Sequence, residues 1–128
     1  MGKIRLLVVG DSPFIHKLIE KILPSEDYEI CAYANKGKEG VDLYLKLQPD
    51  VVAIDVNRPA QHGWANAAEI LRRDSKAKII MLVDRGNEEM MKKAQKTGVM
   101  ACIEKPFKHE QLSALLRLAA EKGYQRIV

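Results

Sequence analysis

The chain has 128 residues, of which 47% are hydrophobic and 30% are charged, and its formal net charge is +4 at pH 7. This composition is typical of a single globular domain and argues against disorder or low complexity. No apolar run approaches the roughly 18 residues of a membrane span, and the basic residues are scattered, so we expect neither a membrane protein nor a nucleic-acid-binding one.

Strand and helix patterns alternate five times, which is the usual signature of an α/β fold with a mostly parallel sheet. Residues 3–9 predict the first strand. Asp11, Ser12 and Pro13 then form a helix start, because a side-chain oxygen can cap the first turn and proline lacks the N–H that would stay unbonded there. Apolar residues at helical spacing continue this helix up to Pro24: Phe14, Ile15, Leu18, Ile19, Ile22 and Leu23.

The next elements are a strand at 29–33, a helix at 37–47 and a strand at 51–56. This third strand is apolar on both faces except at Asp55, a pattern that predicts a central strand covered by helices on both sides. A loop at 57–63 contains Pro59 and Gly63, and a third helix follows through Ala67, Ala68, Ile70 and Leu71.

The last third of the chain predicts a strand at 78–83, a loop at 84–87 and a helix at 88–97, which Gly98 ends. A fifth strand at 99–103 and a fifth helix at 108–122 complete the pattern. We expect one domain over residues 1–123 and a short tail over 124–128.

Three of the strand patterns are followed by charge: Asp11 after the first, Asp55 at the end of the third and Lys105 after the fifth. The carboxyl ends of neighbouring parallel strands face one crevice, so these side chains could meet there. Carboxylates suit a divalent cation, and a lysine offers a point charge to phosphate. The sequence therefore predicts a site for a divalent cation and a phosphoryl group.

The quoted residues stand in longer segments that share one known pattern. These segments are Leu7-Val8-Val9-Gly10-Asp11-Ser12-Pro13-Phe14, Pro49-Asp50-Val51-Val52-Ala53-Ile54-Asp55-Val56-Asn57-Arg58-Pro59, Gly63, Lys78-Ile79-Ile80-Met81-Leu82 and Lys105-Pro106-Phe107. Through them the chain resembles, over essentially its full length, the receiver domain of response regulators, the CheY-like phospho-acceptor module of bacterial two-component signalling. The resemblance implies a flavodoxin-like, doubly wound parallel sheet of five strands in the order 2-1-3-4-5, with five helices.

The same resemblance implies roles for individual residues. Asp55 matches the phospho-acceptor, Asp11 a direct magnesium ligand, and Lys105 the lysine that contacts the phosphoryl group; the backbone carbonyl of Asn57 matches a further metal ligand. It implies a stand-alone receiver that takes its phosphoryl group from a histidine kinase or a phosphotransfer protein in the presence of Mg²⁺. No enzymatic activity is expected beyond its own phosphorylation and dephosphorylation. Pro106 indicates a constrained peptide bond after Lys105, for which the cis form is an option.

Four positions depart from the family pattern. Gly10 replaces the first of two adjacent acids, Val83 replaces a serine or threonine, Asp84 replaces a small residue and Cys102 replaces the switch aromatic. Losing one acid removes about one negative charge, so we expect weak magnesium binding. Gly10, Val83 and Asp84 favour an alternative function, a degenerate pseudo-receiver that acts as a phosphorylation-independent interaction module.

Partners and compartment follow from the same hypothesis. A surface formed by the fourth helix, fifth strand and fifth helix is expected to bind a downstream protein. Cys31 and Cys102 fall on the two edge strands of the implied order, which disfavours a disulfide, and we expect a cytoplasmic protein. His16, His62 and His109 show no ligand spacing, so we expect them at the surface. A nucleotide site has little support, because no glycine-rich loop follows the first strand.

Overall fold

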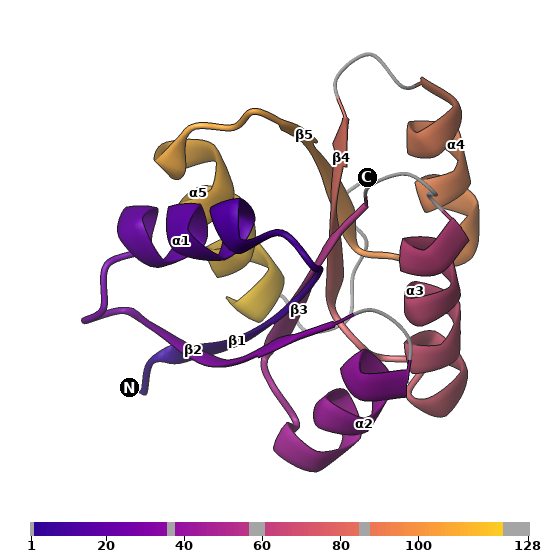
Figure 1. Ribbon diagram of the computed structural model, residues 1–128, viewed down its shortest axis with the longest axis horizontal. Coiled ribbons are helices and arrows are strands. Elements are labelled where there is room, and N and C mark those ends of the chain that lie inside the picture. The colour runs from indigo at the N-terminus through magenta and orange to yellow at the C-terminus, as the bar shows by residue number, and fades with distance from the viewer. Residues whose placement is uncertain (1, 36–37, 57–60, 85–87, 122–128) are drawn as a thin grey trace.

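Strands and helices alternate throughout the computed structural model, which describes residues 2–35, 38–56, 61–84 and 88–121 (Figure 1). The elements are β1 (Ile4–Val9), α1 (Pro13–Ile22), β2 (Tyr28–Ala34), α2 (Lys38–Leu47), β3 (Val51–Asp55), α3 (Gln61–Arg73), β4 (Ile79–Asp84), α4 (Glu88–Thr97), β5 (Ala101–Lys105) and α5 (His109–Glu121). None of the described helices is long and apolar enough to cross a bilayer.

The five strands form one parallel sheet in the order β2-β1-β3-β4-β5, which confirms the flavodoxin-like prediction. Helices α1 and α5 cover one face of this sheet, and α2, α3 and α4 cover the other (Figure 1). The three-layer arrangement leaves the carboxyl ends of all strands along one edge, where ligands of such folds bind.

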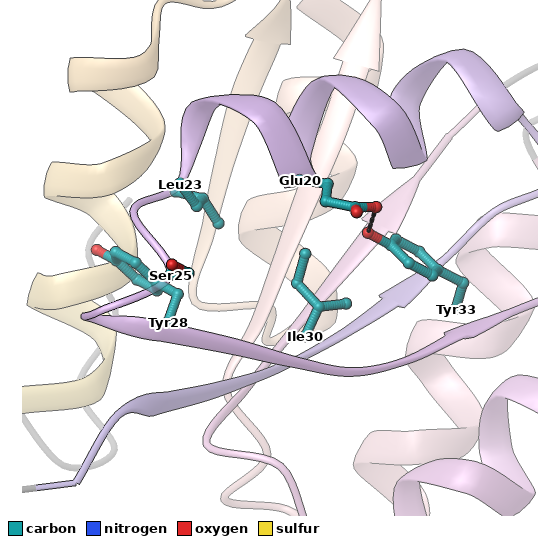
Figure 2. A pocket seen from close by; sticks show the side chains of 6 residues that line it. All are labelled: Glu20, Leu23, Ser25, Tyr28, Ile30 and Tyr33. Atoms are coloured by element: carbon teal, nitrogen blue, oxygen red, sulfur yellow. Dashed lines mark hydrogen bonds between the residues drawn. The ribbon is translucent and has the colours of Figure 1, made fainter.

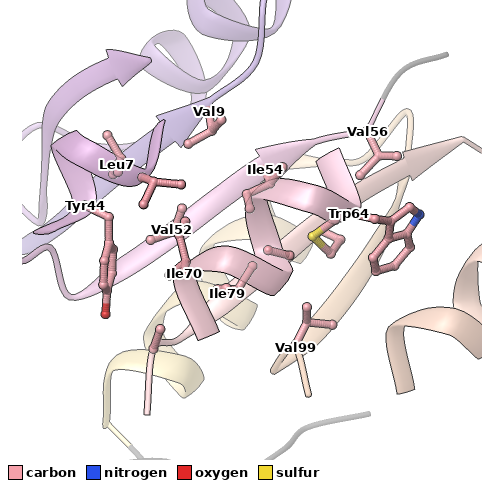
Figure 3. Close-up of a cluster of buried hydrophobic side chains, with 14 of the residues drawn as sticks. Leu7, Val9, Tyr44, Val52, Ile54, Val56, Trp64, Ile70, Ile79 and Val99 are labelled. Atoms are coloured by element: carbon pink, nitrogen blue, oxygen red, sulfur yellow. The ribbon is translucent and has the colours of Figure 1, made fainter. Parts of the chain in front are cut away.

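Alternating side chains of the central strands supply both cores. The first core cluster lies beneath α2, α3 and α4 and is shown in Figure 3. Its residues from the three central strands are Leu7, Val9, Val52, Ile54, Ile79, Met81 and Val83. The second core cluster lies beneath α1 and α5, and its residues from the three central strands are Leu6, Val8, Val51, Ala53, Ile80 and Leu82. Because successive side chains of a strand point to opposite faces, these clusters also fix the side on which each strand-end residue lies.

Helix α1 forms as its sequence predicts. The Ser12 hydroxyl accepts a hydrogen bond from the Ile15 backbone N–H at 3.3 Å, and Pro13 occupies the first turn. The helix ends at Ile22, and Leu23 is its C-cap, one residue earlier than the apolar pattern suggested.

Several predicted boundaries were wrong by one or more residues, and three of these differences bear on packing or on the site. The third helix begins at Gln61, so Gly63 lies inside it, where a Cβ would stand 3.2 Å from Val56 Cγ2; this glycine allows close packing and does not mark a loop. Strand β5 lies at 101–105 and not at 99–103, because the preceding apolar residues are buried without belonging to the regular ladder. Strand β4 extends to Asp84, which was expected in a loop. The predicted helix end at 122 and the tail at 124–128 lie outside the described residues.

Candidate functional site

Asp55 and Lys105 lie in direct contact at the carboxyl edge of the sheet. Asp55 ends β3 and is fully buried, on the same side as Ala53, which faces α1 and α5. Lys105 ends β5, two strands away in the sheet, and its Nζ donates a hydrogen bond to Asp55 Oδ1 at 2.5 Å. The structure thus brings together two charged residues that lie far apart in the sequence.

Burial makes this ion pair important for Asp55. The Asp55 side chain is 0% exposed and the Lys105 side chain 15% exposed. A buried carboxylate is costly unless a cation and hydrogen-bond donors compensate it, and Lys105 supplies both. The peptide bond between Lys105 and Pro106 is cis, as the sequence allowed.

Asp84 is a second carboxylate beside Lys105. It ends β4 and pairs with Lys105 in the ladder between β4 and β5, with its Oδ1 3.6 Å from Lys105 Nζ. Its side chain is 57% exposed, in contrast to Asp55. Lys105 therefore lies between one buried and one exposed carboxylate.

Gly10 packs directly against Asp55. Its backbone N–H donates to the Ala34 carbonyl at 2.8 Å, and a Cβ built on Gly10 would stand 2.8 Å from the Asp55 Cβ. Carbon atoms ordinarily approach to roughly 3.5–4.0 Å, so a side chain does not fit there without a shift. The position lacks space as well as a carboxylate.

Asp11 is the remaining acid predicted for this site, and it is exposed just beyond the end of β1. Strands β1 and β3 pair up to Val9 and Ile54, so Asp11, just beyond β1, and Asp55, the last residue of β3, lie at the ends of neighbouring strands. Two carboxylates fit Mg²⁺, which is usually held by one or two carboxylates together with water and phosphate oxygens. Within the described residues, no group of three or more His, Cys, Asp or Glu side chains is placed to hold a metal. Asn57, the other predicted ligand, lies outside them.

A cavity of about 510 Å³ adjoins Asp55. Its lining residues are Ser12, Phe14, Ile15, Leu18, Asp55, Asp84, Lys105, Pro106 and Phe107. Phe14, which was grouped with the apolar residues at helical spacing in this helix, is 72% exposed beside this cavity. The exposure of Phe14 could have been predicted from the sequence. Without Phe14, a complete apolar stripe at helical spacing is already formed by Ile15, Leu18, Ile19 and Ile22.

Val83 and Cys102 lie on the opposite face of the sheet from Asp55. Val83 is fully buried in the first core cluster, and Cys102 packs against that cluster. Burial raises the pKa of the Cys102 thiol from its ordinary 9.0 to about 11. Cys31, on the other edge strand, donates its thiol hydrogen to the Leu6 carbonyl at 3.3 Å; both thiols are free, as expected.

His16 was expected at the surface, and the structure shows it only partly exposed and in contact with other residues. It is half-buried, with Nε2 2.9 Å from the Gly10 carbonyl oxygen and its ring stacked on Tyr33 at 4.4 Å between centroids. The Tyr33 hydroxyl donates to Glu20 Oε2 at 3.2 Å beside a cavity of about 280 Å³ (Figure 2). Burial and the Glu20 charge raise the pKa of Tyr33 to about 12. His109 is exposed, as predicted, and the His62 side chain lies outside the described part of the structure.

Comparison with known proteins gives consistent matches over most of the chain. A family model described as the response regulator receiver domain matches residues 6–117. The chemotaxis protein CheY of Listeria monocytogenes is 34% identical over 118 residues, which cover 92% of this chain and 99% of that protein. The chemotaxis protein CheY of Halobacterium salinarum is 41% identical over 103 residues, covering 80% of this chain and 85% of that protein. The solved receiver domain of NtrX from Brucella abortus has a TM-score of 0.83 at 28% identity and covers 92% of this chain and 99% of that structure.

Proposed function

The chain belongs to the response regulator receiver family, and from that premise we propose that Asp55 accepts a phosphoryl group in two-component signalling. The observation that carries this proposal is the 2.5 Å contact between Lys105 and Asp55 beside an open cavity. The buried carboxylate is the nucleophile, and the cavity gives a phosphoryl donor room to reach it. Lys105 is already placed to receive the oxygens of the transferred group.

The proposed reaction forms one bond and breaks one. An Asp55 carboxylate oxygen bonds to the donor phosphorus while the bond from phosphorus to the leaving group breaks, and the leaving group carries away the electron pair. Lys105 then exchanges its Asp55 contact for a phosphoryl oxygen. Receiver domains typically bind Mg²⁺, which when bound offsets the repulsion between carboxylate and phosphoryl group. In this chain Asp11, Asp55 and the Asn57 carbonyl would hold it, weakly because Gly10 supplies no carboxylate.

The proposed donor is the phosphohistidine of a kinase or a phosphotransfer protein. The apolar rim of the cavity supports a protein donor: Phe14 is exposed there, next to Ile15, Leu18 and Pro106. An exposed aromatic side chain is a common anchor of protein interfaces. A protein that lays an apolar helix against this rim would bring its phosphohistidine to Asp55.

The proposed output is a change in protein contacts. Acceptance of a phosphoryl group adds roughly −1.5 to −2 charge units, which must be balanced by Lys105 and nearby donors. Asp84 ends the strand that leads to α4, so a response at Lys105 reaches the face formed by α4, β5 and α5, the proposed surface for a downstream partner. We further propose that the domain works alone, as supported by relatives that it spans almost fully, and that it does so in the cytoplasm.

One alternative function has specific support. Val83 is buried without a hydroxyl, and Gly10 leaves no room for a second acid, so the chain could serve as a phosphorylation-independent interaction module. Such a module would keep the receiver fold and its α4-β5-α5 face while Asp55 stays unmodified.

Intact-mass spectrometry separates the two functions. The protein is incubated with acetyl phosphate and Mg²⁺, with Asp55→Asn as the matched control. We expect a single phosphoryl adduct on the unmodified sequence and no adduct on Asp55→Asn. No adduct should form on the unmodified sequence when EDTA has removed the metal before the donor is added. If saturating Mg²⁺ gives no adduct on the unmodified sequence, the acceptor function is wrong and the interaction module takes its place.

A further inference from the structure

We propose that Asp84 acts as a charge filter at this site: its carboxylate shares Lys105 with Asp55 and slows acceptance from strongly anionic phosphoryl donors. The inference rests on the proposed phosphoryl acceptance at Asp55. It concerns which donors react fast and leaves the identity of the acceptor unchanged.

The fold places Asp84 on the same side of the sheet as the acceptor. Leu82 belongs to the second core cluster, so Asp84, two residues further along β4, points to the same side, beneath α1 and α5. Asp55 and Lys105 reach that side from β3 and β5. Strand β4 lies between these two strands, so Asp84 flanks the ion pair from within the sheet.

Lys105 is shared between two carboxylates. Its Nζ lies 2.5 Å from Asp55 Oδ1 and 3.6 Å from Asp84 Oδ1. Among the described residues that line the 510 Å³ cavity, Lys105 is the only lysine or arginine. With Asp84 present, one ammonium faces two carboxylates, and the group of three carries a formal charge of −1 before any donor arrives.

The exposure of Asp84 places its charge where a donor approaches. Asp55 is 0% exposed, whereas Asp84 is 57% exposed and lines the same cavity. A small anionic donor that reaches Asp55 therefore passes close to the Asp84 carboxylate. At about 6 Å in water-like dielectric, each unit of donor charge changes the rate by about threefold, and a doubly charged donor by about tenfold.

Two small donors of different charge test the filter. Acetyl phosphate is doubly charged at neutral pH and phosphoramidate singly charged, and initial rates of adduct formation are followed by intact mass at low donor concentration. We expect Asp84→Asn to raise the rate about tenfold with acetyl phosphate and about threefold with phosphoramidate. Asp84→Glu keeps the charge and should stay near the original rates. Asp42→Asn, the same exchange at an exposed position on α2, should change neither rate.

Salt supplies an independent readout that a merely structural role would not move. Added salt screens like-charge repulsion, so it should speed acetyl phosphate acceptance more in the original protein than in Asp84→Asn. Equal rates in these two proteins, or an equal gain with both donors, would overturn the charge filter and leave Asp55 as the acceptor. No adduct in any variant would overturn the proposed function and this inference with it.

Discussion

Replacing Gly10 with alanine should destabilise the protein, because the added carbon has no room. A Cβ at this position would stand 2.8 Å from the Asp55 Cβ and 3.6 Å from Asp55 Oδ2. The nearest obstacle is a β-carbon on a buried central strand, and it cannot rotate out of the way. Overpacking of this kind typically costs about 1–3 kcal/mol. For a domain of this size, that corresponds to a fall in Tm of roughly 4–12 °C.

Urea denaturation followed by circular dichroism measures this loss, and Gly2→Ala is the matched control. No atom stands within 4 Å of a Cβ built on Gly2, so the control should unfold at the original midpoint. Gly10→Asp should lose at least as much stability as Gly10→Ala and should not give tighter Mg²⁺ binding, because Asp55 must move to accommodate it. An unchanged urea midpoint in Gly10→Ala would refute the close packing between Gly10 and Asp55. The missing carboxylate would then be the only difference that Gly10 makes to the site.

Two further predictions concern the first core cluster and its surroundings. Because burial raises the Cys102 pKa from its ordinary 9.0 to about 11, alkylation of folded Cys31→Ser protein should be slow at pH 8 and accelerate towards pH 11. The folded state favours the neutral thiol, so this contribution to the free energy of unfolding is fully present below pH 9 and is lost as the pH rises through about 11. Alkylation of the folded protein at pH 8 as fast as that of the protein unfolded in urea would contradict the burial of Cys102. The Lys93 ammonium lies 5.4 Å from the centre of the Trp64 ring, so Lys93→Ala should lower stability by about 0.5–1 kcal/mol. Lys92→Ala, at an exposed neighbour, should have no effect, and equal losses would exclude the ring contact.

Most of the helices and strands could be predicted from the sequence, because the patterns that indicate them are local. The Ser12 cap, the helical stripe from Ile15 to Ile22 and the doubly apolar third strand all predict elements that the structure contains. Strand order came from family resemblance, since periodicity does not say which strands pair. The errors arose where tertiary packing, and not the local sequence, decides why a residue is present. Gly63 has the pattern of a loop residue, but in the structure it lies inside a helix and packs closely against Val56.

The candidate site, like the fold, was predicted in part from the sequence. Charges at strand ends were visible, and the parallel sheet brought Asp55 and Lys105 together. The family resemblance placed Asp84 at this site, but its contact with Lys105 was not predicted. The close approach of Gly10 to Asp55 was not predictable either, because it depends on backbone spacing between strands that are distant in sequence. The partners of His16 were missed for the same reason, since Tyr33 lies on a strand across from its helix.

The central claim is that the phosphoryl group resides on Asp55, and borohydride reduction of the phosphorylated protein tests it most directly. An aspartyl phosphate is reduced to homoserine, whereas an unmodified carboxylate and a phosphohistidine are not. Peptide mass spectrometry after treatment with acetyl phosphate and Mg²⁺ should find homoserine at position 55 and at no other aspartate. Homoserine at Asp11 or Asp84, or phosphate that survives reduction on a histidine, would contradict the account.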